Sequence, residues 1–259
     1  MLDGRKMRHC RILTLLLLIF FSSSISQARE TGLAGTDLQL YRPAVDRFGL
    51  FGVNGSRLQG AGEYSLLLSQ SFAFGPLFGI TVNGVPADLA GRVFTTDVAA
   101  SVVLTSFLTV AIDLPLHLYA READFNTLAP FTTQSVGDLS LSLKWRLLEE
   151  GPRRPGLALL VASTFPTGND GKFLGSHGAV PSVDLIAGKE WRNLRLAVNV
   201  GGRFVPRRDV LGLVFDDRIT YGAGFAVPIR FIDPAFSFLG EIVPRSAMLC
   251  EVTSIPTIR

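Results

Sequence analysis

The amino-acid sequence predicts an all-β fold, an antiparallel transmembrane β-barrel of which this chain supplies about nine strands. Three observations lead to this prediction. Apolar and polar residues alternate along many segments, short connections alternate with long ones, and the chain begins with the features of a secretory signal. Strict alternation gives a strand one apolar face and one polar face. In an outer-membrane barrel the apolar face contacts lipid and the polar face lines the lumen.

Residues 1–28 have the features of a secretory signal peptide. Four basic residues lie among residues 1–11, an apolar run of 10 residues follows at 12–21, and the small residues Ser26-Gln27-Ala28 close the segment. We expect cleavage after Ala28. A membrane anchor is the alternative, but the run is well short of the ~20 residues that a spanning helix needs.

Charge and composition argue against a nucleic-acid partner. The chain has 25 Lys and Arg against 22 Asp and Glu, and residues 1–28 hold 4 of the basic and 1 of the acidic residues, which leaves 21 of each. A neutral mature chain offers no basic surface for nucleic acid. The sequence is apolar, with 47% hydrophobic and 18% charged residues, yet it has no second long apolar run. Lipid-facing strands would account for this composition.

The first three predicted strands alternate large apolar residues with Ser, Thr, Asp or His. They are 64–74 (YSLLLSQSFAF), 93–104 (VFTTDVAASVVL) and 107–119 (FLTVAIDLPLHLY). The two-residue turn Thr105-Ser106 is expected to join the second strand to the third. Such a short connection predicts an antiparallel pair.

The remaining six strands continue the pattern, most clearly in GDLSLSLKWRLL, where leucines and Trp145 alternate with Asp, Ser, Lys and Arg. These strands are predicted at 137–148, 157–167, 180–187, 194–205, 218–227 and 235–243. Most of the nine are close to the ~9–11 residues with which a tilted strand crosses a bilayer. The barrel is therefore expected at 63–243, after a periplasmic lead-in at 29–62 and before an irregular tail at 244–259.

The connections alternate in length without exception. The short ones are 105–106, 149–156, 188–193 and 228–233, and the long ones are 75–92, 121–137, 168–179 and 206–217. Membrane barrels have short periplasmic turns and longer extracellular loops, so this alternation is typical of them. A soluble β-sandwich, the third possibility, has no such requirement.

Several short motifs carry a resemblance to a known family. The stretches GDLSLSLKWRLL, ALLVASTFPTG and LAVNVGGRF resemble the barrel region of a bacterial outer-membrane family of phenol (meta-pathway) type transporters, which is related to the amino-terminal barrels of some OmpA-like proteins. The resemblance covers roughly residues 40–243. Its most specific pieces are Gly137-Asp138 with Lys144-Trp145, Pro166-Thr167-Gly168, Asn199-Val200-Gly201 and Gly240-Glu241.

The resemblance implies a porin-like barrel in the outer membrane of a Gram-negative cell. The family has no catalytic signature to transfer to this chain. Single-chain bacterial barrels close with an even number of strands, whereas the tail after residue 243 contains two prolines and no clean alternation. We therefore expect a member of the family that is shortened at its carboxyl end.

Parity along the predicted strands places a set of charged residues on the lumen side. They are Asp97, Asp113, His117, Asp138, Lys144, Arg146, Asp184, Arg195, Arg203, Arg218 and Glu241. Two interpretations stay open. The residues could form a charged constriction that selects solutes, with Lys144 and Arg146 as a basic patch. They could equally fill a small lumen with salt bridges and water.

Other chemistry has weaker support. His117 with Asp113, and His177 beside Ser176, invite a catalytic hypothesis, but no nucleophile motif surrounds either histidine. The loop at 168–175 has too few acidic side chains for the 6–8 oxygen ligands of calcium. We expect no enzyme, no cofactor and no metal. The favoured role is passive passage of small, hydrophobic or aromatic solutes through an outer-membrane barrel in contact with lipid. The alternative is a structural OmpA-like barrel without transport, and the oligomeric state stays open.

Overall fold

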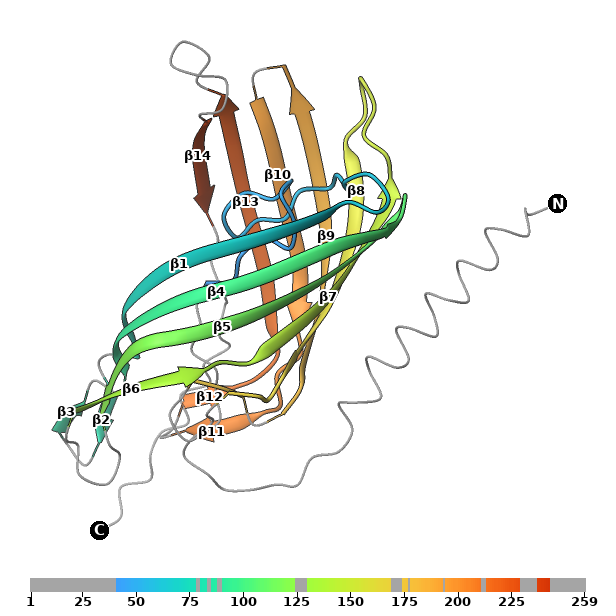
Figure 1. Cartoon of the computed structure of the whole chain (residues 1–259). Helices are drawn as coiled ribbons and strands as arrows, with labels where there is room; N and C mark the ends of the chain where they lie inside the picture. The colour runs from blue at the N-terminus through green and yellow to red at the C-terminus, as the bar shows by residue number, and fades with distance from the viewer. Residues whose placement is uncertain are drawn as a thin grey trace.

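The fold is built around one large antiparallel sheet that curls into a half-barrel, and two small two-stranded sheets lie in its connections (Figure 1). This computed structural model describes residues 41–77, 80–82, 85–87, 90–123, 130–168, 174–176, 178–192, 194–210, 213–228 and 237–242. Within these ranges the elements are all strands, so the predicted all-β antiparallel class is confirmed. A helix long and apolar enough to span a membrane does not occur among the described residues.

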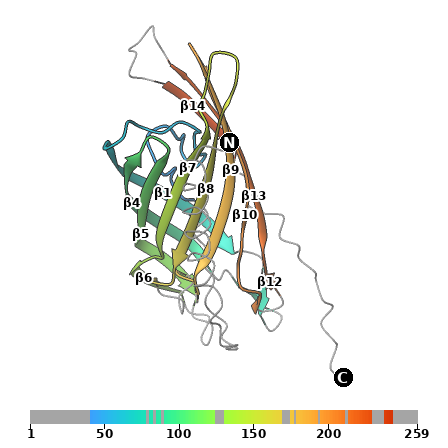
Figure 2. The ribbon, with the colours of Figure 1, turned by 90° about the vertical axis from the view of Figure 1, so that its right-hand side faces the viewer.

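Nine strands follow one another around the sheet, each hydrogen-bonded to the next. In order they are β1 (Tyr64–Leu77), β4 (Ala90–Thr105), β5 (Leu108–Ala123), β7 (Leu139–Leu148), β8 (Gly156–Phe165), β9 (Val180–Trp191), β10 (Leu194–Arg203), β13 (Arg218–Pro228) and β14 (Ser237–Ile242). Figure 2 shows β7 to β10 side by side in this order. Each of the nine predicted ranges overlaps one of these strands.

The long connections contain short strands that the sequence analysis did not predict. They are β2 (Ile80–Val82) with β3 (Val85–Ala87), β6 (Pro130–Val136), and β11 (Arg208–Val210) with β12 (Leu213–Phe215). β6 pairs with the end of β5, next to β7. Four of the five are only three residues long, which is too short for a period of two to be recognised. The predicted turn at Thr105-Ser106 is also shifted, because Thr105 still belongs to β4 and β5 begins at Leu108.

The two faces of the sheet have opposite chemistry. On β7 the side chains of Ser140, Ser142 and Lys144 are buried on the concave side, while the leucines between them are partly exposed. Leu66 is 78% exposed and Phe74 is 71% exposed. Other exposed apolar side chains are Leu68, Phe72, Val98, Val102, Leu104, Ile112, Leu118, Leu185, Leu196, Val198, Val200, Ile219, Tyr221 and Phe225. The convex face is therefore apolar, while most of the buried polar side chains lie on the concave face, the reverse of a soluble sandwich.

Gly201 of β10 shows how the concave face accommodates cross-strand contacts. It lies opposite Asp184 of β9 on one side and Thr220 of β13 on the other. The Thr220 hydroxyl donates to Asp184 Oδ1 at 2.8 Å, over the intervening strand. A Cβ at Gly201 would overlap both Asp184 and the carbonyl oxygen of Val183. Only a residue without a side chain leaves room for this hydrogen bond.

We predict that Gly201→Ala destabilises the sheet by about 1–3 kcal/mol, because the added methyl group overpacks a tight site. Gly202→Ala is the matched control, since the nearest atoms to a Cβ at Gly202 lie 3.8 Å away. Chemical denaturation of both variants in detergent, followed by far-ultraviolet circular dichroism, measures the difference. Equal midpoints for the two variants would contradict the prediction.

Candidate functional site

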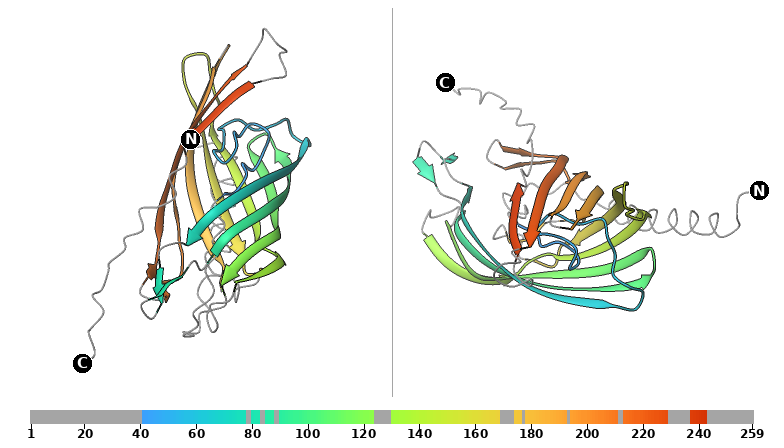
Figure 3. Two further views of the ribbon diagram at one scale, coloured as in Figure 1. Left: turned by 90° about the vertical axis from the view of Figure 1, so that its left-hand side faces the viewer. Right: turned by 90° about the horizontal axis from the view of Figure 1, so that it is seen from above.

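The concave face of the sheet is filled by the chain itself. Residues 41–62, here called the inner segment, lie inside the curl of the sheet, as the view from above shows (Figure 3). Ala44 and Val53 of this segment are buried, and Val45 packs against the apolar cluster of Ala158, Leu160 and Ile186. Residues 41–62 belong to the periplasmic lead-in predicted at 29–62, and their packing against the concave face was not predicted.

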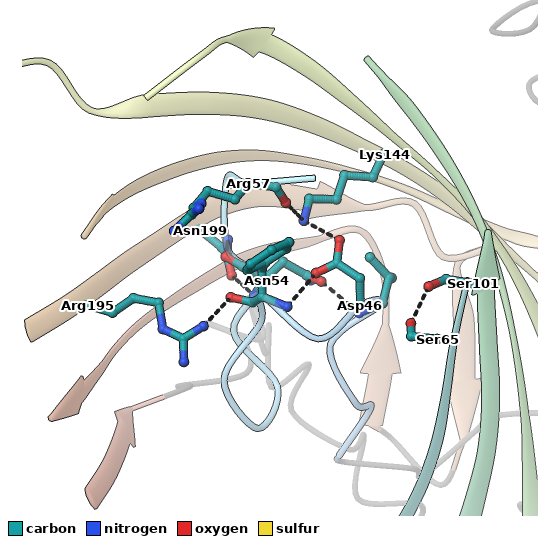
Figure 4. A network of polar contacts seen from close by, with 10 residues as sticks. Asp46, Asn54, Arg57, Ser65, Ser101, Lys144, Arg195 and Asn199 are labelled. Atoms are coloured by element: carbon teal, nitrogen blue, oxygen red, sulfur yellow. Dashed lines mark hydrogen bonds and ion pairs between the residues drawn. The ribbon is translucent and has the colours of Figure 1, made fainter. Parts of the chain in front are cut away.

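A buried ion pair joins the inner segment to β7. Lys144 Nζ lies 2.6 Å from Asp46 Oδ2, and their side chains are 0% and 1% exposed. The same ammonium group donates to the carbonyl oxygen of Arg57 at 2.8 Å. Figure 4 shows Lys144 reaching from the wall toward both residues. The lysine charge, which parity alone places on the concave side, is therefore matched by a carboxylate within the filled interior.

A second contact uses the side-chain amide of Asn199 on β10. Its Oδ1 accepts a hydrogen bond from the Asn54 backbone nitrogen at 2.7 Å, and its Nδ2 donates to the Asn54 carbonyl oxygen at 2.9 Å (Figure 4). The Asn54 side chain in turn accepts from Val45 N at 2.9 Å. One amide thus pairs with both backbone groups of a residue that belongs to no strand, which satisfies polar groups that would otherwise be buried without partners.

Residues near the end of the sheet bind the inner segment as well. Glu241 of β14 accepts backbone hydrogen bonds from Gly52 at 2.9 Å and from Val53 at 3.1 Å. Arg195 of β10 donates to the Phe48 carbonyl oxygen at 3.4 Å. Both were predicted to face the lumen, and here each holds the backbone of the inner segment.

Glycines in the wall make room for the inner segment. Gly156 of β8 and Gly188 of β9 lie opposite each other, and a Cβ on either would come within 2.6 Å of Ser56 Oγ. On β13 a Cβ at Gly224 would overlap Leu50. A larger residue at these positions would hold the segment away from the sheet, so the wall and the segment are fitted to each other.

Asp138 fixes the connection between β8 and β9. Its carboxylate accepts from Gly168 N at 2.9 Å and from Ser176 N at 2.6 Å. The Thr167 hydroxyl donates to the Gly137 carbonyl oxygen at 3.0 Å. The motifs Gly137-Asp138 and Pro166-Thr167-Gly168, separate in the sequence, thus form one structural unit. Asp138 lies at the loop end of β7 and holds that loop.

Three further residues that were predicted to face the lumen lie on β4 and β5. Asp97 is fully buried on the concave side of β4. On β5, Asp113 Oδ2 lies 3.9 Å from Arg42 Nη1 of the inner segment, and the buried His117 is hydrogen-bonded through Nδ1 to Thr95 at 2.9 Å. The second histidine of the catalytic hypothesis, His177, lies outside the described residues, as do Asn169 and Asp170 of the loop considered for calcium.

Lys144 and Arg146 do not form a joint basic patch. Lys144 is paired with Asp46, whereas Arg146 Nη1 lies 3.5 Å from Glu149 Oε1 at the β7–β8 turn. There Arg146 lines an open pocket of about 560 Å³ together with Arg57, Lys189 and Glu190. Arg57 is paired with Glu190, and Lys189 lies 3.3 Å from Glu150. The pocket lining holds four basic and three acidic side chains, so the charges nearly balance.

The last two predicted residues, Arg203 of β10 and Arg218 of β13, lie directly opposite each other at the loop end of the sheet. Both are half-buried. The described residues contain no group of three or more His, Cys, Asp or Glu that could hold a metal ion.

No protein-family model matches this chain, and no curated protein matches it. The class therefore follows from geometry alone. The chain is an antiparallel all-β half-barrel with an apolar convex face, and residues 41–62 cover its polar concave face.

We predict that Asp138→Ala releases the β8–β9 connection, because two backbone N–H groups lose their acceptor. Leaving a buried donor unpaired costs about 1–3 kcal/mol. Hydrogen–deuterium exchange at Gly168 and Ser176 should accelerate at least tenfold. Asp216→Ala is the control, since the Asp216 carboxylate accepts from the backbone nitrogen of its neighbour Asp217 at 2.9 Å and lies 3.9 Å from Arg207 Nε, and neither partner belongs to the β8–β9 connection. Unchanged exchange in Asp138→Ala would show that the carboxylate does not anchor this connection.

Proposed function

We propose that the chain forms the wall of an outer-membrane β-barrel that allows passive passage of small solutes, including hydrophobic or aromatic ones. The observation that carries the proposal is the inverted sheet, with apolar side chains outside and polar side chains inside. The resemblance of the Gly137-Asp138 and Pro166-Thr167-Gly168 motifs to the phenol (meta-pathway) transporter family supports the same proposal. Export through a cleaved signal peptide is part of it.

Energetics favour lipid as the solvent of the convex face. Burying one Leu, Val or Phe side chain is worth roughly 1.5–3 kcal/mol relative to leaving it in water. Side chains such as Leu66, Val198 and Ile219 are exposed across the whole width of the sheet. A hydrocarbon environment would remove this penalty. Eight strands of the main sheet have 10 to 16 residues, enough to cross it: β1, β4, β5, β7, β8, β9, β10 and β13.

The ends of the sheet also suit a membrane barrel. The β4–β5, β7–β8 and β9–β10 turns lie together at one end, opposite the end that carries β2, β3, β11 and β12 (Figure 1). Near the short turns, Phe107 and Trp145 stack with ring centroids 5.2 Å apart, and Trp191 ends β9. Outer-membrane barrels carry aromatic girdles at their interfaces and short turns on the periplasmic side. We therefore propose that the short-turn end faces the periplasm.

The alternative is a structural OmpA-like barrel without passage. The filled concave face favours this second candidate, because residues 41–62 occupy it and the charge of Lys144 is neutralised there by Asp46. Passage and a purely structural role predict the same fold and the same membrane, so only transport measurements distinguish them.

The first experiment is to express the chain with its signal and compare boiled and unboiled outer-membrane fractions by gel mobility. A heat-dependent shift would support a folded, closed barrel in that membrane. Closure matters because β1 and β14 end the described sheet, and an unpaired edge is unfavourable in lipid. Planar-bilayer conductance of the purified protein then tests passage. Recovery of soluble protein from the periplasm without detergent would overturn the proposal.

We predict a depth-dependent effect of arginine on the convex face. Val198→Arg, in the middle of β10, should destabilise the folded protein in lipid by about 2–4 kcal/mol, because a charge at the bilayer midplane is costly. Phe204→Arg, just past the end of β10, should cost about 0–1 kcal/mol, as expected near an interface. Val198 and Phe204 are similarly exposed, at 46% and 41%. Urea titration in vesicles measures both, and equal effects would contradict a lipid-facing convex surface.

A further inference from the structure

We propose that the inner segment, residues 41–62, is a displaceable plug, and that the Asp46–Lys144 pair is the latch that keeps it on the concave face. Displacement exposes the polar wall to water. The further claim that displacement opens a path for solutes rests on the proposed function. The movement itself does not, and the two are tested separately below.

The sheet is complete without the inner segment. Its backbone ladder runs from β1 to β14 through strand pairs alone. The inner segment, in contrast, closes on itself: Ala44 N donates to Phe51 O at 2.9 Å, and Leu50 N donates to Val53 O at 2.8 Å. It is therefore a compact loop that docks on a finished wall, and its departure breaks no strand pairing.

A glycine joins the inner segment to the sheet. Gly62 has a φ of +83°, a left-handed conformation that residues with a side chain rarely adopt, and a Cβ there would have nothing within 4 Å. The preceding Gly60 belongs to the same turn, because Glu63 N donates to the Gly60 carbonyl oxygen at 3.0 Å. Hinges are short element-terminal stretches that absorb backbone rotation. The junction at 60–62 has the composition and position of such a hinge.

Apolar contacts such as Val45 against Ala158, Leu160 and Ile186 hold the plug on the wall, and polar contacts add to them. Lys144, Asn199 and Glu241 hold the segment through hydrogen bonds that water could replace. Some polar atoms have no hydrogen-bond partner among the described residues when the plug is docked. They are Ser56 Oγ, both amide atoms of Gln59 and Thr109 Oγ1. Atoms of this kind favour water over a dry interior, so docking has a cost that displacement removes.

The latch, the ion pair between Asp46 and Lys144, offsets the cost of burying these polar atoms. With both partners present, the charges of Asp46 and Lys144 neutralise each other in a site where each side chain is at most 1% exposed. Removing one partner leaves the other charge buried and uncompensated, which is strongly unfavourable. In the displaced state the remaining charge would be hydrated. A variant that lacks Asp46 should therefore shift the population toward the displaced state.

Thiol labelling measures the displacement without any transport. Thr109→Cys is placed in a background of Cys10→Ser and Cys250→Ser, because Thr109 is fully buried and lies opposite Lys144 in the β5–β7 register. A membrane-impermeant maleimide should label this cysteine slowly in the parent and at least tenfold faster after Asp46→Ala. The charge-swapped pair Asp46→Lys with Lys144→Asp should restore slow labelling.

Arg47→Ala is the matched control for labelling. Arg47 is the next residue and also forms an ion pair, at 2.9 Å from Glu63, but both side chains are about half exposed. An exposed pair contributes little to stability, so labelling should stay within twofold of the parent. Each variant is compared only after its heat-dependent gel shift shows that it is folded. Parent-like labelling in a folded Asp46→Ala variant would overturn the plug.

A disulfide provides a second, independent test. A Cβ at Gly156 would lie 3.3 Å from Ser56 Cβ, close to the ~3.5–4.5 Å of a disulfide. Ser56→Cys replaces the Oγ that a Cβ at Gly156 would crowd with the sulfur that forms the bond. In the same cysteine-free background, Ser56→Cys with Gly156→Cys should therefore lock the plug when oxidised. Reductant should raise the planar-bilayer conductance at least tenfold, and either single-cysteine variant should not respond. This redox pair decides the question if Asp46→Ala does not fold.

The outcomes separate the plug from the proposed function. Fast labelling after Asp46→Ala with redox-controlled conductance supports both. Fast labelling without current in any variant supports the plug and overturns solute passage. Mass spectrometry verifies whether the disulfide has formed. If the current is equal with the disulfide formed and with it reduced, solute passage is supported and the plug is overturned as its gate.

Discussion

The buried pair of Lys144 and Asp46 is the contact on which the filled interior depends. A lysine on the concave side of β7 has to be hydrated or neutralised, because an isolated buried charge is prohibitively unfavourable. The inner segment provides the carboxylate and, from Arg57, a carbonyl oxygen. The course of residues 41–62 across the sheet thus follows from a charge that strand alternation places there. Asn199 then binds the backbone of Asn54, and Glu241 binds the backbone of Gly52 and Val53.

The same alternation determines what surrounds the molecule. Serines, Lys144 and Asn199 point inward from their strands, so the leucines and valines between them have to point outward. No change of register could bury both sets, since a shift by one residue would exchange the faces of a whole strand. The polar interior needs polar partners and the apolar exterior needs an apolar surrounding, and both needs follow from the same alternation. A lipid bilayer around the sheet and a polar plug or water within it would satisfy both sides.

Much of the wall could be predicted from sequence, and the plug could not. The strand 137–148 follows a period of two, which also indicates that Lys144 and Asp138 share a face. The partners of these residues carry no such signal. Asp46 is 98 residues from Lys144 in a segment without periodicity, and Asp138 binds backbone N–H groups that every residue except proline possesses. The local pattern predicts toward which face of the sheet a side chain points, whereas the residue that it contacts from a distant part of the chain depends on the folded structure.

The glycines of the wall distinguish a docked plug from an incidental loop. Gly156 and Gly188 face each other across two strands, at the place where Ser56 approaches. Glycine weakens a strand because it adds backbone entropy to the unfolded chain and packs against nothing. Two facing glycines are unfavourable for an empty sheet and favourable only where another backbone comes close. The wall therefore accepts a local loss of strand stability at the site that receives the inner segment. Docking of residues 41–62 is thus built into the strands as well as into the segment.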